Sequence, residues 1–222
     1  MERSTTPVAN PSYRQRVGYH AGLLGGVCFL VSVLILLGHS RTQGPIAQRL
    51  EEDRLALLQQ VLPHHLYDNN PLINVVRVND PAYSKQAVPA YVAIKKGETN
   101  AVAFESMGRG YSGDIRLIVG LAARGEILGV RVISHTETPG LGDKIELAKD
   151  PWITTFNGRS LANTSEKQWH VRKDGGDFDQ FTGATITPRA VVAAVHKALL
   201  LYQNEIAAKA EARGKTDGQT HL

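Results

Sequence analysis

An uncharged apolar segment near the N-terminus constrains this 222-residue chain more than any other feature. Residues 21–38, AGLLGGVCFLVSVLILLG, carry no charged side chain, and with residues 17–20 they are long enough to cross about 30 Å of hydrocarbon. A cleaved signal peptide is the alternative, but residues 38–41 offer no small-x-small cleavage site. A buried core helix fits less well, because a single chain of this size seldom encloses a helix that is apolar on every side. We predict a retained transmembrane helix over residues 17–38.

The flanking basic residues predict the orientation of this helix. The count is equal on the two sides, with Arg3, Arg14 and Arg16 before the segment and Arg41, Arg49 and Arg54 after it. Proximity breaks the tie, because two arginines adjoin the segment on its N-terminal side and only one does so on the other. The more distant downstream arginines are also mixed with the acidic residues 51–53. The N-terminus is therefore predicted to be cytoplasmic.

The remainder of the chain has the size of one domain. About 180 residues follow the apolar segment, enough for one hydrophobic core. The net charge is +4, but basic and acidic residues are interleaved and no basic cluster has aromatic neighbours, so nucleic acid is not expected as a partner. The single cysteine, Cys28, lies in the apolar segment, which excludes an intramolecular disulfide and an iron–sulfur site made by this chain alone.

Sequence periodicity predicts a mixture of antiparallel strands and helices. Five stretches rich in β-branched residues and bounded by turn residues are expected to be strands: 73–78, 90–95, 101–105, 114–121 and 127–134. Helical spacing predicts a connecting helix over residues 45–62, a short helical region over 145–156 and a longer helix over 190–202. The polar tail, residues 207–222, is expected to fray.

These elements give an α+β fold in which one transmembrane helix precedes a single domain of antiparallel strands and packed helices. The predicted boundaries are a cytoplasmic N-terminus over residues 1–16, the transmembrane helix over 17–38, a connecting helix over 39–66, the domain over 67–204 and a flexible tail over 205–222.

The junction before the last long helix is the first candidate binding site. Residues 181–188, FTGATITP, lead directly into it. Pro188 suits a first helical turn, and Thr185 or Thr187 can cap the free amides there. A helix N-terminus stabilises a phosphate without a basic side chain, and the small residues let a bulky anion approach the backbone, where a hydroxyl can be esterified. An ordinary capped helix has the same pattern.

A second candidate segment, residues 135–144, reads HTETPGLGDK. Its glycines and proline favour an ordered loop whose amides face a ligand, although a surface turn has the same composition. Lys144 either adds positive charge there or pairs with Glu146. The turn at 110–113 either borders the same site or is a plain β-turn. No histidine pair has metal-ligand spacing and no Ser or Cys nucleophile motif is present, so neither a metal site nor a hydrolase is predicted.

Taken together, the two segments resemble the FMN-binding domain family. Residues 179–185, DQFTGAT, resemble the site at which flavin transferases attach FMN, through its phosphate, to a threonine. Residues 135–144 resemble the second signature of that family. With the apolar segment included, the chain is similar to the G subunits of the Rnf/Rsx membrane electron-transport complexes. The C subunits of sodium-pumping NADH:quinone reductases share this plan but are usually longer, and they rank second.

The resemblance implies a set of cofactor-binding residues. Thr185 holds the last position of the Thr-Gly-Ala-Thr core and is the implied covalent site, while Thr187 is a competitor that chemistry alone does not separate from it. Thr182 stands where Ser is also frequent in the family. Asp179 is either recognised by the transferase or closes the turn. The implied set is Thr182, Gly183, Ala184, Thr185 and Thr187 at the phosphate, and Glu137, Thr138, Pro139, Gly140, Leu141, Gly142 and Lys144 beside the flavin ring.

The implied function is electron transfer by covalent FMN, within an ion-translocating oxidoreductase and not as an independent enzyme. No catalytic residue is implied beyond the flavin itself, which connects two-electron donors with one-electron carriers. The implied partners are other Rnf/Rsx subunits, a flavin transferase and the lipid bilayer of a bacterial inner membrane, with the domain periplasmic. An assembly subunit without flavin and a self-sufficient flavin reductase are the alternatives. The second lacks a glycine fingerprint for NADH.

Overall fold

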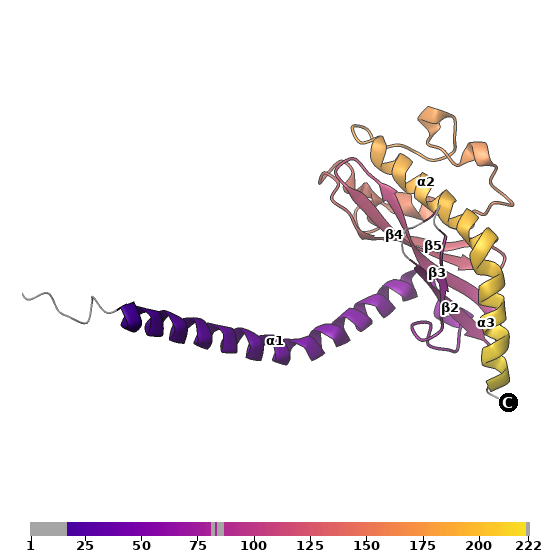
Figure 1. Cartoon of the computed structure of the whole chain (residues 1–222). Helices are drawn as coiled ribbons and strands as arrows, with labels where there is room; N and C mark the ends of the chain where they lie inside the picture. The colour runs from indigo at the N-terminus through magenta and orange to yellow at the C-terminus, as the bar shows by residue number, and fades with distance from the viewer. Residues whose placement is uncertain (1–16, 81–82, 84–86, 221–222) are drawn as a thin grey trace, which may run out of the picture. The chain divides into compact units, whose positions relative to one another are not determined.

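The computed structural model describes residues 17–80, 83 and 87–220. The predicted cytoplasmic N-terminus, with Arg3, Arg14 and Arg16, lies outside the described residues. The chain divides into two units, Met1–Glu52 and Asp53–Leu222. Helix α1, Val17–Val61, passes from the first unit into the second (Figure 1).

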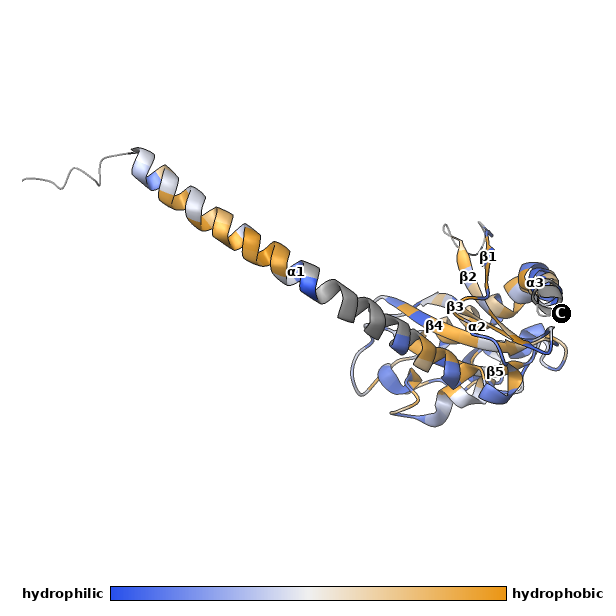
Figure 2. Cartoon of the chain, turned by 90° about the horizontal axis from the view of Figure 1, so that it is seen from below, coloured by the Kyte–Doolittle hydropathy of each residue, from blue (hydrophilic) through white to orange (hydrophobic). Residues whose placement is uncertain are grey.

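The N-terminal part of α1 has the properties of a membrane span. Residues Gly18–His39 form a helical segment of 22 residues with a mean hydropathy of 2.5, and none of it is buried inside the protein. Figure 2 shows this segment as the most continuous hydrophobic part of the helix. By length and composition it can cross a membrane, as predicted.

The predicted connecting helix is present, and it continues directly from the apolar segment. No break separates it from the apolar segment, because α1 runs through Pro45 and ends only at Val61. A proline removes only one N–H from the helix, and residues of high helix propensity, such as Ala47 and Leu50, follow it. The chain then passes through Pro63 into a single 3₁₀ turn, His64–Leu66. The domain boundaries themselves stay predictions.

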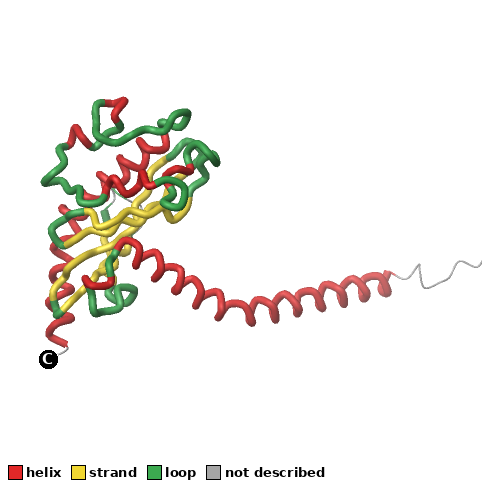
Figure 3. The backbone as a smooth tube through the Cα atoms, turned by 180° about the vertical axis from the view of Figure 1, so that it is seen from behind, coloured by secondary structure: helices red, strands yellow, loops and turns green. Residues whose placement is uncertain are grey.

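A five-stranded antiparallel sheet forms the centre of the second unit (Figure 3). The strands follow chain order: β1 Val75–Val78, β2 Val88–Lys95, β3 Glu98–Arg109, β4 Asp114–Ala122 and β5 Ile127–Ser134. Lys96 and Gly97 connect β2 to β3 with positive φ angles of 54° and 78°, the conformation of a two-residue hairpin turn. The five predicted strands are confirmed, and β3 is longer than predicted.

One face of the sheet is covered by the C-terminal helices. Helix α2, Ile186–Leu201, leads through a π-helical turn, Tyr202–Ile206, into α3, Ala207–Thr220. Gly108 lets α2 lie close to β3, because a Cβ there would be 2.5 Å from the Ala190 carbonyl oxygen. Ser106 Oγ fixes the same contact by donating to the Ala194 carbonyl at 2.9 Å.

The C-terminal tail also differs from the prediction. Residues expected to fray form helix α3, because its alanines provide a small apolar side that packs on the sheet. Ala210 is buried, and its carbonyl oxygen accepts a hydrogen bond of 2.8 Å from Thr99 Oγ1 of β3. The polar composition that predicted fraying belongs to the exposed side chains of the helix.

The opposite face of the sheet is covered by the last turn of α1. Leu58, Val61 and Leu62 are buried there against small residues of the strands. Gly120 makes this contact possible, because a Cβ on it would overlap the Val61 carbonyl oxygen. Gly120 is paired across the sheet with Gly129, so two glycines form a shallow depression under Val61. The predicted α+β fold of antiparallel strands and packed helices is thus confirmed, and the sheet is covered on both faces.

Candidate functional site

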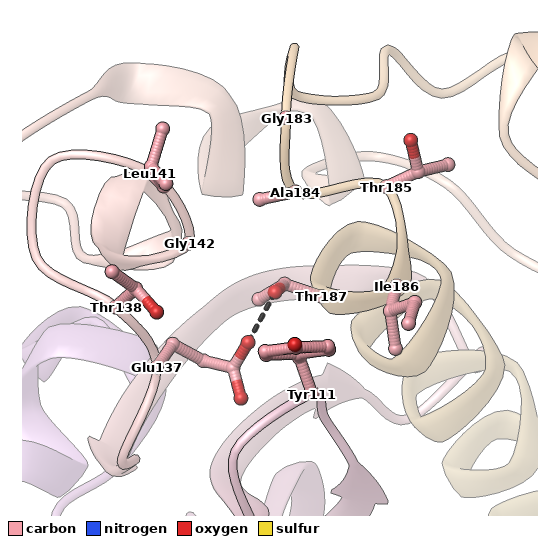
Figure 4. Close-up of a pocket in the computed structure, with 10 residues that line it drawn as sticks. All are labelled: Tyr111, Glu137, Thr138, Leu141, Gly142, Gly183, Ala184, Thr185, Ile186 and Thr187. Atoms are coloured by element: carbon pink, nitrogen blue, oxygen red, sulfur yellow. Dashed lines mark hydrogen bonds between the residues drawn. The ribbon is translucent and has the colours of Figure 1, made fainter.

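A cavity of about 500 Å³ lies where three segments of the second unit meet (Figure 4). One is the turn between β3 and β4, the second is the loop after β5, and the third is the segment that enters α2. Tyr111 comes from the first of these segments. The remaining lining residues are Glu137, Thr138, Leu141 and Gly142 from the loop and Gly183, Ala184, Thr185, Ile186 and Thr187 from the third segment.

The segment entering α2 is a tight turn followed by a helix N-terminus. Gly183 has a φ of +82°, a conformation that favours glycine, and the Ala184 N–H donates to the Phe181 carbonyl at 3.1 Å. Thr185 is the N-cap residue of α2, and Pro188 lies in the first turn as predicted. The backbone N–H groups of such a first turn lack partners inside the helix and are available to an anion.

The two candidate threonines occupy different environments. The predicted cap is wrong for both, because the Thr185 side chain makes no capping bond and the Thr187 hydroxyl points to another segment. Thr187 is fully buried, and its Oγ1 donates to Glu137 Oε2. Thr185 is partly exposed, and its hydroxyl points away from Glu137 in Figure 4. The helix geometry places one hydroxyl in the protein interior and leaves the other accessible.

Glu137 is a buried carboxylate in the wall of the cavity, with an exposed fraction of 5%. Its Oε2 accepts from the Thr187 hydroxyl, and its Oε1 accepts from the Ser112 backbone N–H at 3.1 Å. Both donors come from other segments of the cavity wall. The isolated charge would be costly to bury, and these two hydrogen bonds offset that cost.

The loop after β5 is held by its own backbone. The N–H groups of Leu141 and Gly142 both donate to the Thr138 carbonyl, at 3.2 and 3.0 Å. These two amides are therefore already used inside the loop, in contrast to the expectation that they face a ligand. Gly140 has a φ of +77°, which the turn requires. Gly142 is packed tightly, since a Cβ there would lie 2.9 Å from the Glu137 Cβ.

A charged network lies behind this loop. His135 Nε2 is 2.7 Å from Glu146 Oε1, and Lys149 Nζ is 2.8 Å from Asp143 Oδ2 and 2.9 Å from Glu146 Oε1. The contact with Lys149 lowers the pKa of Asp143. Contacts with His135 and then Lys149 lower the pKa of Glu146. The ion pair considered between Lys144 and Glu146 is replaced by these contacts.

Aromatic side chains support the segment that precedes Thr185. Trp152 packs edge-on against Phe181 with ring centroids 5.1 Å apart, and its Nε1 donates to the Asp179 carbonyl at 2.9 Å. The Asp179 carboxylate forms an exposed ion pair with Arg172 at 2.6 Å. Residues 179–185 are therefore held in place by the Asp179 carbonyl and by the Phe181 ring, while the Asp179 side chain lies at the surface.

The structure brings most of the predicted site residues together. Eight of the predicted residues line the cavity, whereas Thr182, Pro139, Gly140 and Lys144 are exposed and do not line it. Ile186 also lines the cavity and was not among the predicted residues, although it lies directly between the two candidate threonines. For the turn at 110–113, which carries Tyr111, the sequence left open whether it borders the site. The structure shows that Tyr111 lines the cavity.

Comparison with known proteins identifies the family. Residues 110–200 match the FMN-binding domain model, a range that includes every lining residue of the cavity. The chain is 54% identical over 183 residues to the G subunit of the ion-translocating oxidoreductase complex of Cereibacter sphaeroides, covering 82% of this chain and 83% of that protein. The chain belongs to this family of G subunits.

Other members of this family include the G subunit of the same type of complex from Stutzerimonas stutzeri, which is 49% identical over 195 residues and is matched over 88% of this chain and 85% of its own length. Among solved structures, the crystal structure of Shewanella oneidensis NqrC is similar with a TM-score of 0.45 and 22% identity, covering 67% of this chain and 73% of that one.

The cavity fits the phosphate and the ring of an FMN group. Its volume lies within the range of about 300–1,000 Å³ that is usual for small-molecule sites. Three exposed apolar side chains, Tyr111, Leu141 and Ile186, line it with exposed fractions of 73%, 44% and 46%. A flat aromatic ring can cover such side chains, while the first turn of α2 offers amide donors to a phosphate.

Proposed function

We propose that this chain is a flavin-carrying electron-transfer subunit of a membrane complex that couples electron transfer to ion translocation. FMN is attached through its phosphate to Thr185. One observation carries the residue assignment: Thr185 is accessible at the cavity and makes no capping bond, whereas the Thr187 hydroxyl is buried and bonded to Glu137. A transferase can reach the Thr185 hydroxyl without disrupting the domain.

The residues of the chain hold and orient the cofactor. The amides in the first turn of α2 stabilise the phosphate, and the small residues Gly183 and Ala184 leave space for it. Tyr111, Leu141 and Ile186 cover the apolar ring. When bound, FMN accepts two electrons and releases them singly. The protein itself supplies no acid, base or nucleophile for this transfer.

The names of the relatives support the assembly of this subunit into a complex, and the apolar span supports its place in a membrane. The related G subunits are named for an ion-translocating oxidoreductase complex, so the partners proposed here are the other subunits of such a complex. A flavin transferase is the partner during maturation. The span Gly18–His39 anchors the chain in the lipid bilayer of a bacterial inner membrane, with the N-terminus cytoplasmic and the domain periplasmic.

In-gel flavin fluorescence tests the proposal. The full chain is produced together with a flavin transferase, denatured, separated by electrophoresis and illuminated before staining. Wild type is expected to fluoresce, Thr185→Ala to be dark and Thr187→Ala to retain at least part of the signal. Fluorescence that survives Thr185→Ala would contradict the residue assignment. A wild-type chain that never carries flavin would favour the assembly subunit without flavin.

A further inference from the structure

Glu137 joins three walls of the cavity through one side chain. It belongs to the loop after β5, its Oε2 binds Thr187 in the first turn of α2, and its Oε1 binds the Ser112 N–H in the turn that carries Tyr111. Thr187 is fifty residues away in sequence and Ser112 is twenty-five. The contacts therefore connect segments that are distant in sequence, and they do so at the cavity itself.

The carboxylate is enclosed as well as bonded. A Cβ added at Gly110 would overlap Glu137 Oε1, and a Cβ at Gly142 would lie 2.9 Å from the Glu137 Cβ and 3.0 Å from Thr187 Oγ1. The glycines on two sides thus leave the room that this side chain occupies, which a Cβ at either position would reduce. Because both oxygens accept hydrogen bonds, the ionised form matches the donors around it.

The backbone of Glu137 is fixed by a separate contact. Its N–H donates to His135 Nδ1 at 3.1 Å, so the ring proton of a neutral His135 stands on Nε2 and donates to Glu146 at 2.7 Å. Lys149 in turn holds Glu146 at 2.9 Å. Hydrogen bonds therefore fix both the side chain and the backbone N–H of Glu137.

We propose that Glu137 is the positioning residue of the site. Its hydrogen bonds fix the Tyr111 turn and the first turn of α2 relative to each other, and this arrangement sets the orientation of the flavin ring once the phosphate is attached. The inference rests on the proposed attachment to Thr185. Glu137 acts on the orientation of the cofactor only, and its attachment depends on Thr185 and the transferase.

Four substitutions separate positioning from charge. Glu137→Gln keeps the shape, accepts from Ser112 with its Oε1 and donates to Thr187 with its amide, so it retains the hydrogen bonds without the charge. Glu137→Ala removes the hydrogen bonds and the charge. Thr187→Val exchanges a hydroxyl for a methyl group of similar shape, whereas Thr187→Ser retains the hydroxyl. Glu98→Ala removes an exposed carboxylate at the start of β3 and is the matched control.

The visible circular dichroism of the attached flavin is the readout, because a ring held in one orientation by a chiral site gives a signal that a mobile ring loses. The full chain is used, produced with a flavin transferase and checked for folding by far-ultraviolet circular dichroism. Glu137→Ala and Thr187→Val are expected to keep in-gel fluorescence and to lose most of the visible signal. Glu137→Gln, Thr187→Ser and Glu98→Ala are expected to keep both.

Two results would overturn the inference. One is a full visible signal in folded, flavin-carrying Thr187→Val, the variant that decides the matter if Glu137→Ala fails to fold. The other is a signal in Glu137→Gln as low as in the alanine variant, which would make charge and not positioning the cause. Absence of in-gel fluorescence in the wild type is a different outcome, and it would contradict the attachment on which the inference rests.

Discussion

Removal of the Thr187 hydroxyl is expected to destabilise the domain, whereas removal of the Thr185 hydroxyl is not. In Thr187→Val the buried Glu137 Oε2 loses its donor, which costs about 1–3 kcal/mol for an unsatisfied buried group. Thr185 makes no capping bond and is partly exposed, so Thr185→Val should change the free energy of unfolding by less than about 0.5 kcal/mol. The two variants make the same chemical change two positions apart.

Thermal unfolding of the full chain without flavin measures the difference. In a domain of this size, 1 kcal/mol shifts Tm by roughly 2–4 °C, so Thr187→Val should melt about 2–12 °C below wild type. Thr185→Val should melt within about 2 °C of wild type. Equal losses in the two variants, or a larger loss in Thr185→Val, would refute the assignment of one buried, bonded hydroxyl and one accessible hydroxyl.

Three further predictions concern other parts of the molecule. Gly120→Ala places a Cβ 2.9 Å from the Val61 carbonyl carbon and should cost about 1–3 kcal/mol in urea unfolding; a neutral result would show that α1 does not press on the sheet there. The lowered pKa of Asp143 contributes stability that is present at neutral pH and lost as pH falls through the folded-state value. The difference in Tm between wild type and Lys149→Gln should therefore shrink on acidification from pH 7 towards pH 3, and a constant difference would exclude this ion pair as the source. A reporter that is active only outside the cytoplasm should be active when fused after Leu222, and activity only in an N-terminal fusion would reverse the proposed topology.

The strands and the two candidate segments of the site were predictable because their signals are local. Alternating β-branched residues and turn glycines mark β4 and β5 almost to the residue. The glycine and threonine pattern before α2 identifies the turn at Gly183 and the helix that follows. Resemblance to a family then connected this segment with the loop after β5, which lies beside it in the cavity.

The remaining features depend on contacts between distant residues. The apolar segment and the connecting helix were predicted as separate segments, yet α1 runs through Pro45 and joins them in one helix. The polar composition after Ile206 concealed the alanines that pack α3 on the sheet. No sequence pattern shows that the Thr187 hydroxyl meets Glu137, because their contact exists only after the sheet and α2 have packed. That contact is what distinguishes the two threonines.

Mass spectrometry of the tryptic peptide spanning residues 174–189 tests the central claim most directly. This peptide, DGGDFDQFTGATITPR, contains Thr182, Thr185 and Thr187, so one fragment spectrum compares all three hydroxyls. After co-production with a flavin transferase, the added mass of FMN is expected on Thr185 alone. FMN on Thr187 or Thr182 would contradict the assignment drawn from the geometry of α2, and a peptide without added mass would contradict the proposed covalent flavin.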